Sequence, residues 1–166
     1  MYVWDNTVGS SRRVNPTALA YIAGFLDGDG CIKARLDKQP NNKFGWRTRI
    51  AVSFTQHTRN RHVLDWIYSQ LRNGSIADYP SKNLSEYVIT DSKFVERLLK
   101  GLKLYVVNKF KQLDLALQLL ILKDRFKNKD SFNKGLELAL QIRGLNHYHK
   151  KHFSSNPVTT DMEGTR

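Results

Sequence analysis

Two segments of the chain alternate between apolar and polar residues, and this pattern constrains the fold more than any other feature. In residues 32–37 every second side chain is apolar, and residues 47–54 repeat the pattern from Thr48 to Phe54. A period of two places alternate side chains on opposite faces of a β-strand. The intervening positions, which would share the other face, are Lys33, Arg35, Asp37, Arg47, Arg49 and Ser53. With the polar residues 38–45 between them, the segments predict a hairpin that is covered on one face and strongly cationic on the other.

Helical patterns surround this hairpin. Asn15 and Pro16 predict the N-cap and first residue of a helix that is stopped by the Asp27-Gly28-Asp29-Gly30 sequence. Further helices are predicted at about residues 61–71, 109–123 and 131–145, and another is capped by Asp91 or Ser92 and directs Leu102 inward. A second strand pair is predicted at 75–79 and 84–90. The order α-β-β-α-β-β-α-α-α indicates one α+β domain with helices on one face of an antiparallel sheet. We place this domain at residues 15–146, after an N-terminal arm (1–14) and before a basic, polar C-terminal tail (147–166).

The charge balance indicates a polyanionic partner. The chain has 27 Lys and Arg against 15 Asp and Glu, a net charge of +12. Such an excess favours nucleic acid first, then an acidic membrane surface or a ribosome-like assembly. The single cysteine, Cys31, excludes an intrachain disulfide and a four-thiolate zinc site. No stretch has the length and apolarity of a signal peptide or a membrane span, so we expect a soluble intracellular protein that does not enter a membrane.

The first predicted helix carries small residues in a row and ends in two acids. Ala20, Gly24 and Gly28 recur every four residues, a spacing that lets another helix backbone approach closely. Gly24 costs a helix ~1 kcal/mol relative to alanine, which calls for a packing reason. Asp27 and Asp29 lie at the negative end of the helix dipole, where a cation is favoured, and carboxylates suit Mg²⁺ or Ca²⁺. Taken alone, the acids are more simply interpreted as an acidic turn.

The surrounding residues change that interpretation. Residues 20–30 read AYIAGFLDGDG, which closely resembles the signature helix of the LAGLIDADG homing endonucleases. The resemblance implies that two signature helices pack together at a twofold or pseudo-twofold axis. It implies that Asp29 binds a catalytic metal with the Gly28 carbonyl, while Asp27 belongs to the structure of the helix end. It also implies an αββαββα domain with additional C-terminal helices, whose saddle-shaped antiparallel sheet lays its cationic face in the DNA major groove.

Two further segments extend the resemblance. The end of the second strand, FTQHT at residues 54–58, implies an active-site glutamine at Gln56. The segment KFKQ at residues 109–112 is similar to the start of a later helix in the single-motif branch, which implies an active-site lysine at Lys109. One position departs from the family. The basic residue that is common four positions beyond the glutamine is replaced by Asn60, and its neighbours Arg59 and Arg61 are candidates for its role.

The chain contains one copy of the signature, and an interface of two signature helices needs two. The resemblance therefore implies a homodimer that meets along Ala20, Gly24 and Gly28, with one active site around each Asp29. A twofold dimer implies a DNA target with approximate twofold symmetry. We expect Mg²⁺ as the cofactor, with Mn²⁺ able to substitute and Ca²⁺ able to bind without supporting cleavage. No small-molecule cofactor is expected.

The cationic face would then read double-stranded DNA. Arginine and lysine can donate to guanine O6 and N7, and aspartate can accept from cytosine N4. The residues expected to contact DNA are Lys33, Arg35, Asp37, Asn41, Asn42, Lys43, Arg47, Arg49, Ser53, Arg59, Arg61, Glu86, Lys150 and Lys151.

The function predicted from the sequence is a site-specific homing endonuclease. It would make a double-strand break in a long, pseudo-palindromic target by metal-dependent hydrolysis of phosphodiester bonds. Two alternatives keep the same fold: an RNA maturase and a DNA-binding regulator that does not cleave. The carboxylate of Asp29 favours the enzyme, because a protein that only binds DNA has no need of a negative charge beside the phosphates.

Overall fold

The structure is a computed structural model that describes residues 14–41, 43–123 and 128–146. Most of the expected N-terminal arm and the whole C-terminal tail lie outside the described residues. The candidate DNA contacts Asn42, Lys150 and Lys151 lie there too. Their roles stay predictions.

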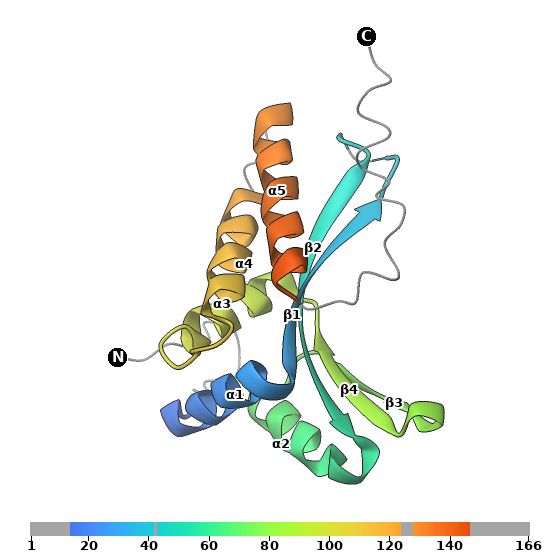
Figure 1. Ribbon diagram of the computed structural model, residues 1–166, viewed down its shortest axis with the longest axis vertical. Helices are drawn as coiled ribbons and strands as arrows, with labels where there is room; N and C mark the ends of the chain where they lie inside the picture. Colours follow the sequence, from blue (N-terminus) through green and yellow to red (C-terminus); the bar gives the residue numbers. More distant parts are fainter. Residues whose placement is uncertain (1–13, 42, 124–127, 147–166) are drawn as a thin grey trace.

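Four antiparallel strands form one sheet in the order β1-β2-β4-β3. They are β1 (Gly30–Lys38), β2 (Trp46–His57), β3 (Ser75–Tyr79) and β4 (Leu84–Ile89). Figure 1 shows the sheet strongly curved, with its concave side turned away from the helices. Both predicted strand pairs are therefore confirmed. The alternation that predicted β2 ends at Phe54, but the strand continues to His57 because its last residues still pair with β4.

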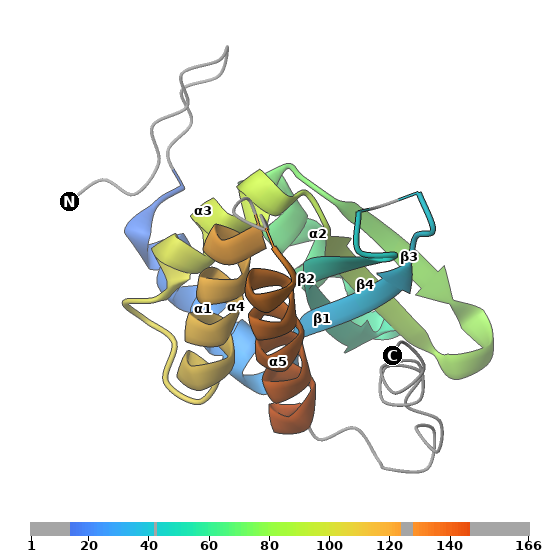
Figure 2. The same ribbon diagram turned by 90° about the horizontal axis from the view of Figure 1, so that it is seen from above.

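Five α-helices cover the other side of the sheet (Figures 1 and 2). They are α1 (Pro16–Asp29), α2 (Arg61–Leu71), α3 (Ser92–Leu102), α4 (Phe110–Lys123) and α5 (Lys129–Leu145). α4 and α5 pack against each other, and α5 also lies along β1, the edge strand. Just after α5, the Asn146 side-chain amide donates to the Ile32 carbonyl of that edge at 2.8 Å. The predicted α+β architecture with one covered face is confirmed.

The buried core lies between the helices and one face of the sheet. The apolar positions of the alternating segments point into it, with Ile32, Val52 and Phe54 fully buried. They meet the inner faces of the helices, which contribute Leu19, Ile22, Leu26, Leu64, Ile67, Leu98, Leu99 and Leu113. The alternation thus assigned the inner face of both long strands correctly.

The end of α1 differs from the prediction. We expected the Asp27-Gly28-Asp29-Gly30 sequence to stop the helix, but α1 continues through Asp29. Gly30 is extended, with φ −97° and ψ 168°, and begins β1 directly. The loop before α4 holds Asp27 in the last helical turn, and Asp29 contacts Gln56 at the end of β2, so both acids lie within the helix and no separate turn precedes β1. After α2, both Arg72 (φ 51°) and Gly74 (φ 93°) have positive φ, and Arg72 is the C-cap of the helix.

Gly30 permits this direct passage from helix to strand. A Cβ at Gly30 would lie 2.6 Å from the Leu26 Cα and 2.9 Å from the Leu26 carbonyl oxygen, both backbone atoms. We therefore expect Gly30→Ala to lower the free energy of unfolding by about 1–3 kcal/mol, the usual range for overpacking. The measurement is urea denaturation. Gly144→Ala is the control, because a Cβ there meets nothing within 4 Å and alanine favours a helix by up to ~1 kcal/mol. Equal stability of the two variants would show that the junction does not require glycine.

Candidate active site and DNA-binding face

The structure brings together the ends of α1 and β2. Asp29 is the last residue of α1 and is exposed, and its Oδ2 accepts a hydrogen bond from Gln56 Nε2 at 2.5 Å. This contact follows from the strand register. Gly30, the first residue of β1, pairs with Phe54 of β2, so Gln56 extends two residues beyond and reaches the helix end. Two of the three residues predicted to form the active site are in direct contact.

The third residue, Lys109, lies beside the same helix end. Its ammonium donates to the main-chain carbonyl of Asp27 at 2.7 Å, within the last turn of α1 and not to the Asp29 carboxylate. A cation is favourable at that position, because the last carbonyls of a helix have no partner within it. Gly28, the other predicted metal ligand, is exposed in the same turn. The predicted residues therefore gather at one point of the protomer.

Asp27 holds this arrangement in place. Its Oδ2 accepts from the backbone amides of Val107 at 2.7 Å and Asn108 at 3.0 Å, and its Oδ1 accepts from that of Lys109 at 2.9 Å. Burial of the Asp27 carboxyl opposes its ionisation. The three amide hydrogen bonds, together with the positive charge of Lys109, outweigh this and hold its pKa below the ordinary value. The structural role implied for Asp27 is seen here, and the residue also positions Lys109, which the sequence did not indicate.

Asn60, the residue that departs from the family pattern, lies next to Gln56. The Asn60 Nδ2 lies 3.4 Å from Gln56 Oε1, on the side of the glutamine away from Asp29. Of its two basic neighbours, Arg61 forms ion pairs with Asp65, at 3.4 Å, and with Asp78 of β3. Arg59 is exposed. Arg61 is thus directed toward carboxylates on α2 and β3, which leaves Arg59 as the better candidate for a DNA contact.

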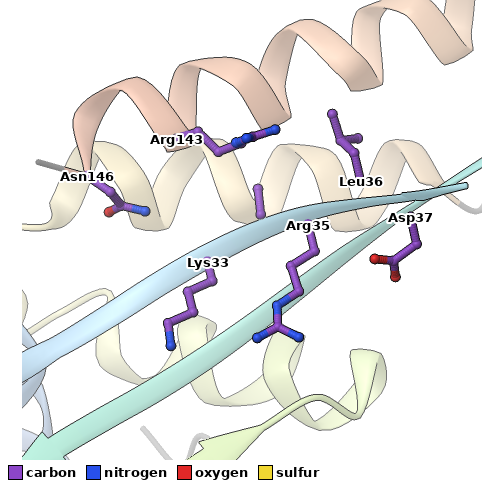
Figure 3. Close-up of a pocket in the computed structure, with 7 residues that line it drawn as sticks. Lys33, Arg35, Leu36, Asp37, Arg143 and Asn146 are labelled. Carbon is purple, nitrogen blue, oxygen red and sulfur yellow. The ribbon is translucent and has the colours of Figure 1, made fainter. Parts of the chain in front are cut away.

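The outer, concave face of the sheet carries most of the other predicted DNA contacts. Figure 3 shows Lys33, Arg35 and Asp37 on the side of β1 that points away from α5. Ion pairs join this face across strands: Lys33 to Glu86 of β4 at 2.5 Å, and Arg49 to Asp37 at 3.0 Å. The Lys33 and Glu86 side chains are each 20% exposed. The carboxylates thus order two cations on this face.

Two arginines on this face stand opposite each other. Arg35 of β1 is the register partner of Arg49 of β2, and both are exposed. Like charges directly opposite one another destabilise a strand pair. A polyanion on the concave face would remove that repulsion, so the arrangement favours a nucleic-acid partner.

The remaining predicted contacts differ in accessibility. Asn41, Lys43 and Arg47 are exposed at or near the β1–β2 turn. Ser53 lies on the outer face as its strand position requires, but it is 1% exposed because it stands inside the sheet between Cys31 and Val88. Strand parity identifies the face of a residue but does not show whether neighbouring side chains cover it.

Beside the edge of β1 lies Arg143 of α5, a residue that we did not predict as a DNA contact. A cavity of about 330 Å³ lies between this edge and the end of α5, and its lining includes Lys33, Arg35, Arg143 and Asn146 (Figure 3). Arg143 comes from the last turn of α5 and is brought to the cationic strand by the packing of α5 on β1. Arg143 lies 105 residues beyond the end of that strand, and no local sequence pattern indicates this proximity.

Within the part of the chain that the structure describes, no three His, Cys, Asp or Glu side chains gather as a metal site. None of the described helices has the length and apolarity needed to traverse a bilayer. At the place where a metal was predicted, the described residues offer one exposed carboxylate, that of Asp29.

Comparisons with known proteins agree with this geometry. The sequence model of the LAGLIDADG endonuclease family matches residues 22–121. The DNA endonuclease I-CreI of Chlamydomonas reinhardtii is 30% identical over 158 residues, which span 92% of this chain and 93% of that protein. The DNA endonuclease I-CvuI of Chlorella vulgaris is 27% identical over 101 residues, 61% of this chain and 62% of that protein.

Solved structures show the same fold. I-CvuI in complex with the I-CreI target superposes with a TM-score of 0.74 at 24% identity, covering 81% of this chain and 85% of that one. The archaeal intron-encoded endonuclease I-Vdi141I, complexed with DNA, gives a TM-score of 0.70 at 22% identity, covering 81% and 88%.

The chain therefore belongs to the LAGLIDADG endonuclease family. It is a DNA-cleaving hydrolase of the homing-endonuclease class, with a single copy of the family signature at the end of α1.

The lowered pKa of Asp27 predicts a defined pH dependence of stability. An acid whose pKa is lower in the folded state stabilises the protein above its unfolded value, here about 3.8, and loses that contribution as the pH falls through the folded value. At neutral pH we expect Asp27→Asn to cost about 1–3 kcal/mol, the range for hydrogen bonds to a charged group. The difference from wild type, measured by denaturation at a series of pH values, should shrink below pH 4. A difference that stays constant with pH would show that the charge of Asp27 is not responsible.

Proposed function

We propose that this endonuclease works as a homodimer that breaks both strands of a pseudo-palindromic DNA target, with divalent metal held at the Asp29 carboxylates of the two protomers. The observation that carries the proposal is the position of Asp29. It stands exposed at the end of a helix that also carries Gly24 and Gly28, where an added Cβ would meet no described residue within 4 Å.

The outer face of α1 supports a second copy as the partner. Gly24 and Gly28 are exposed, and a Cβ built at either position meets nothing within 4 Å. Each glycine costs the helix ~1 kcal/mol relative to alanine, and no contact among the described residues explains why glycine stands there. Glycine would be needed at these positions if the backbone of another α1 approached closely. Because the only signature helix of the chain is α1, the partner that matches this face is the α1 of a second copy.

Exposed apolar residues flank the glycines. Tyr21 stands one helical turn before Gly24, is 49% exposed, and packs edge-on against Trp66 of α2, which is 40% exposed. On the other side, the loop held by Asp27 carries Leu104 and Val107, which are 72% and 85% exposed. Large apolar side chains around a row of glycines are typical of a protein interface. A second copy on α1 would bury them.

The residues present fit a hard divalent cation. Asp29 offers an exposed carboxylate, and the Gly28 carbonyl belongs to the negative end of the α1 dipole. The hydrogen-bond partner of Asp29 is the neutral amide of Gln56, so its negative charge is not balanced there. Oxygen ligands of this kind suit Mg²⁺, with Mn²⁺ as a substitute and Ca²⁺ as an ion that binds without supporting cleavage. Asp29 of a second copy and DNA phosphates would supply the further oxygen ligands.

Each residue of the site then has a role in hydrolysis. The metal, when bound, stabilises negative charge on the attacking and leaving oxygens of the phosphodiester. Gln56 fixes the orientation of the Asp29 carboxylate through its amide. Lys109 places a positive charge at the α1 end, where it offsets charge that develops on the phosphate.

The concave face would read the target. A twofold dimer presents two such faces, one to each half-site, so the target needs approximate twofold symmetry. The paired side chains offer both donors and acceptors to base edges: Arg and Lys suit guanine, and Asp and Glu suit cytosine. In this proposal Lys33, Arg35, Asp37, Arg47, Arg49 and Glu86 contact bases or phosphates, and the turn residues Asn41, Asn42 and Lys43 extend the contact outward.

Asp29→Asn tests the assignment of the site. The variant keeps the shape of the side chain but removes its charge, so cleavage in Mg²⁺ should fall by about 100-fold or more. Binding of the same duplex should be unchanged or slightly tighter, because one negative charge near the phosphates has gone. Binding and nicking are measured on one target, with Mg²⁺ and with a chelator.

Asp130→Asn is the matched control, because Asp130 is exposed in the first turn of α5 and away from the site. It should cut at the wild-type rate. If Asp29→Asn also cuts at that rate, the site assignment fails. If the wild type binds a target tightly but cuts it in neither Mg²⁺ nor Mn²⁺, a maturase or regulator replaces the enzyme.

A further inference from the structure

Asn60 occupies the N-cap position of α2 but does not cap the helix. Asparagine favours this position because its side-chain oxygen can accept from an unpaired backbone N–H of the first turn. In α2 no such bond is made by the Asn60 side chain. Three other helices do have a side-chain cap of this kind, from Asn15, Asp91 and Asn128.

The Asn60 side chain is directed to the active site instead. Its Nδ2 lies 3.4 Å from Gln56 Oε1, and Gln56 Nε2 lies 2.5 Å from Asp29 Oδ2. The three side chains thus form a chain of donors and acceptors that ends at the carboxylate. Asn60 and Gln56 are both partly buried, which limits how water can replace these bonds.

The carboxylate of Asp29 fixes the direction of these hydrogen bonds. An ionised carboxylate can only accept, so the NH₂ group of Gln56 must face Asp29. The Oε1 atom of Gln56 then points to the opposite side and needs a donor there, and the NH₂ group of Asn60 supplies it. If that donor were lost, the Gln56 amide could rotate and turn its own oxygen toward the Asp29 carboxylate, where the two would repel.

The basic neighbour on α2 is engaged elsewhere. Arg61 forms ion pairs with Asp65 and Asp78, so its guanidinium is held toward α2 and β3. A neutral donor at Asn60 therefore orients the glutamine without adding charge next to Asp29. The side chain next to Gln56 on this side is therefore the neutral amide of Asn60 and not a guanidinium.

We propose that Asn60 is a positioning residue of the nuclease site, which holds the Gln56 amide in the orientation that places Gln56 Nε2 on Asp29. The inference rests on the proposed roles of Asp29 and Gln56. It adds a residue whose effect on the reaction is exerted through Gln56 and not by contact with DNA.

Asn60→Ser separates positioning from helix capping. Serine caps a helix about as well as asparagine and is uncharged, but it is too short to reach Gln56. We expect the melting temperature and the DNA affinity to stay at wild-type values. The single-turnover cleavage rate should fall about 10- to 100-fold, the usual loss when an outer residue that orients a site is removed. In the metal-free protein, the side-chain amide resonances of Gln56 should shift and exchange faster with water.

Two further variants make the test specific. Asn128→Ser makes the same exchange at the N-cap of α5, where the asparagine does cap its helix, and should leave cleavage unchanged. Gln56→Ala removes the residue through which Asn60 is proposed to act. In that background Asn60→Ser should slow cleavage no further, because the two residues act as one unit.

Two results would overturn the proposal. One is wild-type cleavage by Asn60→Ser together with unchanged Gln56 amide resonances. The other is an equal loss of rate from Asn60→Ser with and without Gln56, which would mean that Asn60 acts by another route. The Asp29→Asn variant separates this failure from failure of the proposed function. If Asp29→Asn cuts normally, the active-site assignment is wrong, while the Gln56 resonances still report whether Asn60 orients the amide.

Discussion

The arrangement of the site depends on how Asp27 binds three consecutive backbone amides of the loop before α4. A carboxylate in the last turn of a helix is unfavourable, because the helix dipole is negative there. The amides of Val107, Asn108 and Lys109 offset that cost, and the Lys109 ammonium binds the carbonyl of the same residue. The loop and the helix end thereby stabilise each other. Asp29 can then remain helical, two residues after Asp27, and Gly30 can begin β1 without a turn.

The site that results is made of short contributions from distant parts of the chain. α1 provides Asp29, the end of β2 provides Gln56, and the N-cap position before α2 provides Asn60. At this site, however, one chain supplies a single exposed carboxylate, Asp29, and α1 carries two glycines at which an added Cβ would meet no described residue within 4 Å. The proposed second copy, joined along α1, would account both for these glycines and for the incomplete ligand set. The same twofold axis would place two concave cationic sheets side by side for the two halves of a target.

The sequence predicted the elements whose signals are local. The alternation in β1 and β2 identified the buried and the cationic faces, and the limits of α2 and β3 were predicted to the residue. The contact of the Asp27 carboxylate with the loop before α4 was not predicted, because the first of the three amides lies 80 residues away in the chain. Ser53 was assigned to the correct face, but its burial depends on neighbours in two adjacent strands. Arg61 is a candidate for the site in the sequence, but its ion pair with Asp78 of β3 could not be predicted, because the two residues lie 17 positions apart on different elements. In each case the missing information is a contact between segments that are distant in sequence.

If the active site forms only when two copies meet along α1, the variant Gly24→Leu should abolish it. A side chain at Gly24 meets nothing in the protomer, so the variant should fold with a cooperative melting transition like that of the wild type. It should sediment as a monomer at concentrations where the wild type is a dimer, and it should lose double-strand cleavage. Gly144→Leu, at an equally open glycine of α5, should keep both the dimer and the cleavage. A wild-type protein that sediments as a monomer while it cuts both strands, or a Gly24→Leu variant that cuts at the wild-type rate, would contradict the account.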